Sequence, residues 1–138
     1  MNSLSHRRRR RGQSLVEVAL LLPVLIIIMA GVIDLGRALD ASIVLANAAR
    51  TGARFGSMHP TWYDSIRVRV VDFANSSGMA FTGVVLQGSN VAISSSSVPG
   101  NPVIVTVTYD LPLYFGPIIG VNSVRIVRQA EMIVMTGP

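Results

Sequence analysis

An apolar segment near the start of the chain constrains its fold more than any other feature. It runs from Leu15 to Ile33, and Glu17 is its only charged residue. As a helix it would extend about 28 Å, close to the hydrocarbon thickness of a bilayer. The residues that precede it include five consecutive arginines: Arg7, Arg8, Arg9, Arg10 and Arg11. Because positive charge is retained on the cytoplasmic side, the sequence predicts a single-pass membrane protein with its N-terminus in the cytoplasm and its C-terminal part outside.

The segment differs from a secretory signal peptide, which has an apolar region of about 7–15 residues followed directly by a small-residue cleavage site. Here the charged residues Asp34 and Arg37 follow the run. We therefore expect the segment to stay in the mature protein. Glu17 is unusual in it, since a carboxylate costs about 2.5–3.5 kcal/mol near the bilayer centre and less towards the interface. It either reaches back to the headgroups or has a dedicated partner.

The residues at the start of the segment resemble the processing site of class III signal sequences, which mark type IV pilins and pseudopilins. Gly12, Glu17 and the apolar helix that follows carry this similarity. The resemblance implies that a prepilin peptidase cuts between Gly12 and Gln13 and removes residues 1–12, so that Glu17 becomes the fifth residue of the product. It also implies that Glu17 pairs with the N-terminal amine of a neighbouring subunit when the helices bundle.

The charge balance agrees with such a cut. The chain has 12 basic residues, all arginine, against 7 acidic ones, for a net charge of +5. Residues 1–12 contain five of the arginines and no acid, so their removal leaves a net charge of zero. Basic runs of this size also bind nucleic acid or anionic lipid. A removable cluster at a membrane segment is better explained as a signal for orientation, and we expect no nucleic-acid partner.

The helical pattern continues beyond the apolar run. Apolar residues recur at spacings of three and four at Leu35, Leu39, Ile43, Ala46, Ala49 and Ala53. This spacing predicts one helix from about Ser14 to Phe55, with these residues on its packing face. Pro23 lies inside the helix and is expected to kink it, because proline lacks the N–H that would bond to the carbonyl of Ala19.

An alanine-rich stretch from Leu45 to Arg54 sharpens the resemblance. Together with Gly12, Glu17 and Pro23, it is similar to the first helix of TadE-like proteins, the minor pseudopilins of tight-adherence (Flp) pilus systems. Val18 stands where the major Flp pilins carry a tyrosine, which favours a minor component. The resemblance implies partners of three kinds, namely a prepilin peptidase, other pilin or pseudopilin subunits, and an inner-membrane assembly platform.

The remaining residues predict a small α+β domain with a second helix and a short antiparallel sheet. The helix is expected from Thr61, as N-cap, to Asn75, with Trp62, Ile66, Val70 and Phe73 on one face. The predicted strands are Val84–Leu86, Val91–Ile93, the alternating Val103–Tyr109, and a last strand from Val121 or Ser123 to Met135. A proline-containing connector, Leu111–Gly120, precedes the last strand. The chain thus divides into a leader (1–12), a transmembrane and stalk helix (13–56) and an exported domain (57–138).

The sequence offers little for catalysis. It has no cysteine and two histidines, His6 and His59, neither within a cluster of acidic residues. No spacing typical of a metal site or of a nucleophile with its base occurs, so we expect no metal, no cofactor and no enzyme activity. The leading hypothesis is a structural subunit that is stored in the cell membrane and assembles or primes a pilus-like filament. The alternative is an uncleaved, membrane-anchored binding module of the cell envelope.

Overall fold

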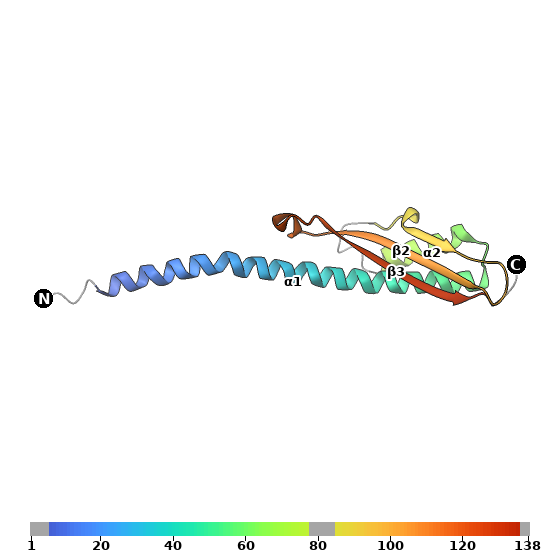
Figure 1. Ribbon diagram of the computed structural model, residues 1–138, viewed down its shortest axis with the longest axis horizontal. Coiled ribbons are helices and arrows are strands. Elements are labelled where there is room, and N and C mark those ends of the chain that lie inside the picture. Colours follow the sequence, from blue (N-terminus) through green and yellow to red (C-terminus); the bar gives the residue numbers. More distant parts are fainter. Residues whose placement is uncertain (1–5, 78–84, 136–138) are drawn as a thin grey trace.

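A long helix, a shorter second helix and a small sheet make up the described part of the molecule, as Figure 1 shows. The computed structural model describes residues 6–77 and 85–135, with the side chains of residues 6–12 and 119 excepted. The elements in chain order are α1 (His6–Met58), α2 (Tyr63–Ser76), η2 (Gly88–Asn90), β1 (Val91–Ser94), β2 (Pro102–Pro112), η3 (Gly116–Ile119) and β3 (Ser123–Ile133). The predicted α+β class, with a long N-terminal helix, a second helix and an antiparallel sheet, is confirmed.

Helix α1 is longer than predicted at both ends. It has 53 residues and passes through Pro23 without ending, so the kink at this proline stays a prediction. At its C-terminus the expected stop at Gly56 comes too early, because the backbone N–H of His59 still donates to the carbonyl of Phe55 (3.1 Å). Gly56 serves packing instead, since a Cβ there would lie 2.8 Å from a methyl group of Val103. Pro60 follows the helix.

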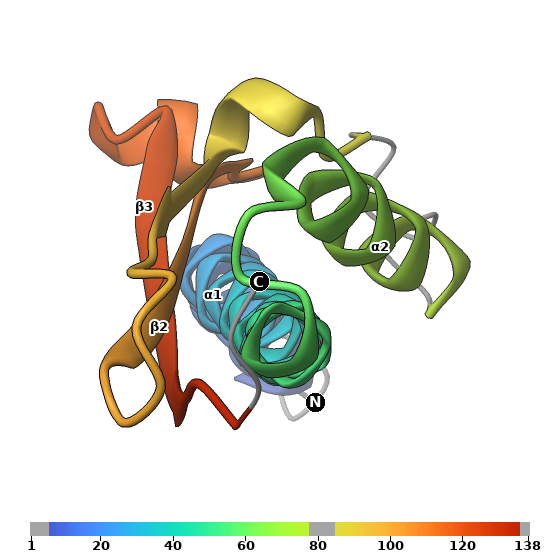
Figure 2. The same cartoon turned by 90° about the vertical axis from the view of Figure 1, so that its right-hand side faces the viewer.

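The second half of α1 lies between the sheet and α2, as the view along the helix axis shows (Figure 2). The face that packs is made mainly of small residues: Ala41, Val44, Leu45, Ala48, Ala49, Gly52, Ala53 and Gly56. The predicted packing face was therefore wrong for its larger members, because Leu35, Leu39 and Ile43 are exposed. Small residues are buried because two layers approach the same stretch of helix closely, which leaves the bulky apolar row on the outside.

The sheet has the order β1-β2-β3 and is antiparallel throughout. The alternation predicted for β2 is confirmed, with Val103, Val105, Val107, Tyr109 and Leu111 buried. The last strand was predicted to run to Met135 with Val124, Ile126, Ala130, Met132 and Val134 facing the core. Strand β3 ends at Ile133, and these residues are buried or packed against the core except Val124, which is exposed.

The predicted strand at Val84–Leu86 is wrong for its described part, and Val84 lies outside the described residues. Val85 and Leu86 are not in a strand. The side-chain amide of Asn75 bonds to both backbone groups of Leu86, accepting from its N–H (3.0 Å) and donating to its carbonyl (3.3 Å). These two bonds replace the pairing that a neighbouring strand would supply.

Helix α2 begins two residues later than predicted, and Thr61 is not its N-cap. Trp62 takes that position, without a side-chain capping bond. Ile66, Val70 and Ala74 are the buried residues of the helix, and Phe73 packs at the edge of the core. Trp62 does not enter the core. It is 55% exposed, with its ring 4.7 Å from that of His59.

Substitution of two glycines on α1 should have opposite effects on stability. A Cβ at Gly52 would collide with a methyl group of Val70 on α2, a stiff β-branched side chain, whereas Gly36 has open space around it. We expect Gly52→Ala to destabilise the protein by about 1–3 kcal/mol through overpacking. Gly36→Ala should stabilise it by up to about 1 kcal/mol, because alanine is the better helix former. Thermal unfolding of the full chain in detergent measures both, and equal shifts in one direction would contradict the packing described.

Candidate functional site

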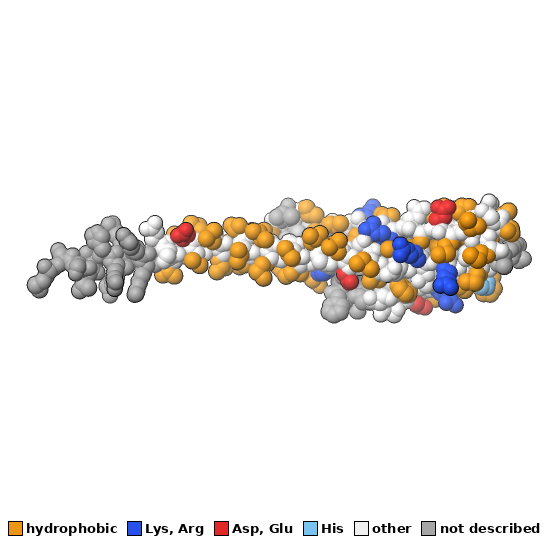
Figure 3. Space-filling view, turned by 90° about the horizontal axis from the view of Figure 1, so that it is seen from below, with side chains coloured by type: hydrophobic (Ala, Val, Ile, Leu, Met, Phe, Trp, Pro, Cys, Tyr) orange, Lys and Arg blue, Asp and Glu red, His pale blue; other side chains and the backbone are white. Residues whose placement is uncertain are grey.

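The first half of α1 projects from the domain with its apolar side chains uncovered. Every large apolar side chain from Leu15 to Ile33 is exposed, in contrast to the core helix of a soluble protein. Figure 3 shows these side chains wrapped around the projecting helix, with the charged side chains gathered mainly over the folded domain. The helix is long and apolar enough to cross a membrane. A surface of this kind suits a membrane, with lipid or other helices as its surroundings.

The predicted processing and pairing residues lie near the free end of this helix. The backbone of the five arginines and Gly12 is helical, and their side chains lie outside the described part of the structure. Gln13 and Glu17 are exposed and four positions apart, hence on the same face of α1. Among the described side chains, none forms an ion pair with Glu17. Cleavage after Gly12 and pairing through Glu17 stay predictions.

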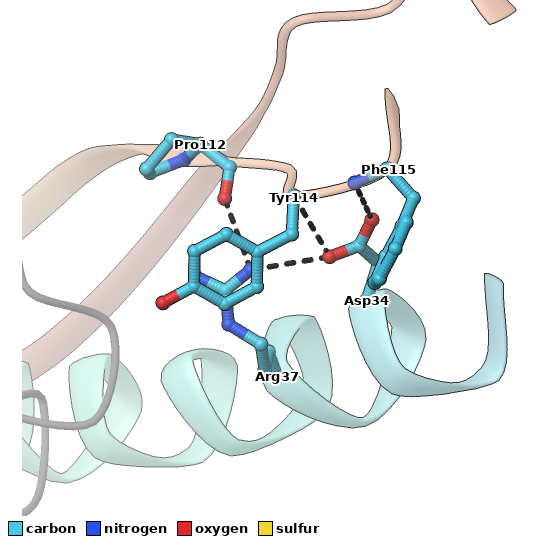
Figure 4. Close-up of polar contacts among 5 residues, drawn as sticks. All are labelled: Asp34, Arg37, Pro112, Tyr114 and Phe115. Carbon is cyan, nitrogen blue, oxygen red and sulfur yellow. Dashed lines mark hydrogen bonds and ion pairs between the residues drawn. The ribbon is translucent and has the colours of Figure 1, made fainter. Parts of the chain in front are cut away.

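At the other end of the apolar run, α1 is fastened to the segment that joins β2 to β3. The predicted connector began at Leu111, but Leu111 and Pro112 belong to β2, so we call residues 113–122 the connector. The carboxylate of Asp34 accepts hydrogen bonds from the backbone N–H groups of Tyr114 and Phe115, both at 3.0 Å. Arg37 donates to the same carboxylate (3.1 Å) and to the carbonyl of Pro112 (3.2 Å), and its guanidinium lies 3.7 Å from the ring centre of Tyr114. Figure 4 shows the contacts of this Asp34–Arg37 clasp.

The clasp holds a buried ion pair in place through several contacts at once. Asp34 is 7% exposed, and the side chain of Arg37 is 13% exposed. Burial of a charge is costly unless its bonds are made. The carboxylate has strong, charge-assisted hydrogen bonds from two adjacent N–H groups, whereas Nε and Nη2 of Arg37 are buried without a hydrogen-bond partner. The clasp therefore sets the position of the connector along α1. It carries no nucleophile or base arrangement, and we assign it a positioning role.

Sequence reasoning missed the clasp, because Asp34 and Arg37 were interpreted only as charged residues that follow the apolar run. Two signals pointed to it. The charges stand three apart at the end of a long apolar run, and the connector opposite them has no charge of its own. An acid and a base at this spacing usually form a surface pair, which is why the pattern alone did not distinguish a buried clasp from a solvated one.

An apolar groove of about 380 Å³ lies beside the clasp, between α1 and the connector. Its walls include Ile27, Ala30 and Gly31 of the helix, and Phe115 and Ile118 of the connector. Among the described residues, no three histidine, aspartate or glutamate side chains lie together as a metal site would require. The lining favours an apolar occupant.

Further along the sheet, two contacts stabilise β3 without forming a site. Arg125 makes two hydrogen bonds to Asp110 of β2, at 2.7 and 3.1 Å. These bonds hold the pKa of the Asp110 carboxyl below its usual value and raise the pKa of Arg125. Arg128 donates to the hydroxyl of Ser42 on α1 (3.0 Å). Both pairs are exposed, so they contribute little to the free energy of unfolding.

Comparison with known proteins gives a match to one family, and this match lies within α1. Residues 12–54 match the family model described as TadE-like protein. None of the curated proteins and none of the solved structures that were searched matches the chain. The matched segment starts at the glycine of the predicted processing site, includes the projecting half of α1 and the clasp residues, and ends within the part of α1 that packs in the domain. The TadE-like resemblance of this segment is confirmed.

Proposed function

We propose that this chain, TadE-like over residues 12–54, is a minor pseudopilin that acts in assembling or priming a tight-adherence pilus or a related secretion filament. At the level of the family, the match associates the chain with tight-adherence pilus systems. The observation that carries the proposal is the uncovered apolar half of α1, which projects from a folded domain. A helix of this kind has two suitable surroundings, a bilayer and a bundle of similar helices.

In the proposed mechanism, the helix leaves the bilayer and enters a bundle of similar helices. The apolar run is stored in the cell membrane with the leader in the cytoplasm and the domain outside, and it is then withdrawn into a bundle with other subunits. The exposed row of Leu35, Leu39 and Ile43 extends the apolar surface beyond the run by about 15 Å. Gly31 and Gly36 have open space around them, which allows a second helix to approach closely.

Glu17 makes this exchange selective. None of the described side chains forms an ion pair with the Glu17 carboxylate. An unpaired carboxylate within a membrane costs free energy. A neighbouring subunit that has lost residues 1–12 offers a new terminal amine close to the level of Glu17. The two opposite charges can pair only after processing, so unprocessed chains are excluded. The proposed partners are thus the prepilin peptidase, other pilin or pseudopilin subunits and the inner-membrane platform.

The intact mass of the protein tests the proposal most directly. We expect the chain to lose residues 1–12 when a prepilin peptidase is co-expressed and to keep them when the peptidase is absent. A chain that stays at full length with an active peptidase, verified on a known prepilin, would favour the alternative of an uncleaved envelope-binding module.

Replacement of Gly12 by leucine should block this processing. The resemblance places the cut directly after Gly12, where a large side chain would occupy the space that the peptidase needs. The variant should keep five additional arginines and a net charge of +5 in place of zero, which isoelectric focusing resolves readily. Ser14→Ala, two residues away, is the matched control and should be processed normally. Normal processing of Gly12→Leu would remove the assigned cleavage site.

A further inference from the structure

The connector has the composition of a membrane-interface segment. Residues 113–122 contain no charged side chain and include Tyr114, Phe115 and Ile118. Ile118 is 69% exposed, and the two aromatic residues are exposed as well. Aromatic side chains concentrate where a membrane meets water, because one end of the ring is apolar and the other tolerates polar surroundings.

The position of the connector along α1 is the second observation. Phe115 and Ile118 share the apolar groove with Ile27 and Ala30 of the helix. Ala30 is 5% exposed, although its neighbours along the run are uncovered, so the connector reaches this level of α1. Ile27 lies about 9 Å before the end of the apolar run at Ile33. Figure 1 shows the connector extending from the sheet over α1, toward the N-terminal end of the helix.

The backbone of the connector is also prepared for surroundings without water. Asp34 accepts from the N–H groups of Tyr114 and Phe115, as described above. Backbone carbonyls accept from the N–H groups of four more connector residues: Leu113 (3.1 Å), Ile118 (3.1 Å), Gly120 (3.3 Å) and Val121 (3.0 Å). Non-helical backbone enters the apolar part of a membrane only when its polar groups are bonded, since each unbonded group costs several kcal/mol.

We propose that the connector is a second membrane contact, with Tyr114, Phe115 and Ile118 inserted into the outer leaflet and lipid chains filling the groove beside α1. The proposal rests on the membrane anchoring by α1 that forms part of the proposed function. Lipid is the occupant because the connector lies beside turns of α1 that precede Ile33, within the expected bilayer span. The Asp34–Arg37 clasp then sits at the membrane surface and fixes the depth of insertion. The exported domain is held against the membrane at two points.

Depth-dependent fluorescence quenching tests this contact. The chain has no cysteine, so one label can be placed at a time. Ile118→Cys places an environment-sensitive fluorophore on the exposed connector, and Ser97→Cys places it on the exposed loop between β1 and β2 as a matched control. Ile26→Cys, in the apolar run, reports whether α1 spans the membrane. The full chain is reconstituted in phosphatidylcholine vesicles at less than one copy per vesicle, with spin-labelled lipid near the headgroup or near the chain end.

We expect the Ile118 label to show blue-shifted emission and to be quenched most by the spin label near the headgroup, because interfacial elements lie about 5–10 Å deep. The Ser97 label should show neither effect. A quenched label at Ile26 with an unquenched one at Ile118 would overturn the connector proposal and leave the anchoring intact. Loss of quenching at Ile26 would overturn the anchoring, and the connector proposal with it. A blue-shifted Ile118 label that lipid does not quench would indicate cover by protein and would also overturn it.

Discussion

A Glu17→Ala variant should be processed and inserted into the membrane as efficiently as the unaltered chain, yet fail to assemble with other subunits. Removal of the carboxylate should not hinder insertion, because Glu17 lies about 3 Å inside the start of the apolar run, where a charge costs less than the about 2.5–3.5 kcal/mol of the bilayer centre. In the helix bundle, the terminal amine of the neighbouring subunit would lose its proposed partner. A buried charge left unpaired costs about 3–5 kcal/mol. We therefore expect at least about a 100-fold loss of subunit association.

Two measurements separate assembly from insertion. Extraction with alkaline carbonate reports membrane insertion, and the yield of cross-linked or filament-bound protein reports assembly. Glu131→Ala removes an exposed acid from β3 and is the control, with no expected effect on either. Glu17→Gln should resemble Glu17→Ala if the charge matters, and should retain assembly if a hydrogen bond suffices. Normal assembly of both Glu17 variants would show that the exchange does not depend on this residue.

Features with a single strong cause could be predicted from the sequence. The apolar run from Leu15 to Ile33 is too long and too uniform for a soluble surface helix, and the helix that contains it is confirmed. The alternation from Val103 to Tyr109 has the period of a half-buried strand, and those four inward residues are buried. In both cases the pattern follows from the backbone geometry of one helix or strand and from the apolar environment on one side or all sides of it.

Features that depend on how elements meet could not be predicted. On α1 the larger apolar residues Leu35 and Ile43 were predicted to lie on the packing face, whereas the face that packs is formed by small residues such as Ala48 and Gly52. Helical spacing places residues on common faces, but it does not say which face two further layers will cover. The choice follows from the close approach of α2 and the sheet, which only small side chains permit.

The clasp illustrates a second limit of sequence reasoning. Asp34 and Arg37 bond to a segment 75 to 81 residues further along the chain. Nothing in the local pattern shows that the connector returns to this turn of α1. The processing site differs again, because the described residues beside it, Gln13 and Glu17, are exposed. Its prediction rests on a motif rather than on packing.

Replacement of Asp34 by alanine should release the connector from α1 while the rest of the domain stays folded. The change leaves two adjacent N–H groups without their acceptor and a largely buried guanidinium without its counter-ion. An uncompensated buried charge costs about 3–5 kcal/mol, enough to open the segment locally. Hydrogen exchange at the amides of Tyr114 and Phe115 should therefore accelerate by about 100-fold or more.

The control for this experiment is Asp40→Ala, which removes an exposed acid six residues further along the same helix. It should leave all exchange rates unchanged. In Asp34→Ala the amide of Val105 in the buried centre of β2 should keep its protection, because the core of the domain does not depend on the clasp. Equal acceleration at Val105 would mean that the clasp supports the whole domain, and unchanged exchange at Tyr114 would mean that the connector is held by its apolar contacts alone. Local release of the connector, with the core intact, is the result that follows from a clasp whose bonds end on the connector and on Pro112, the last residue of β2.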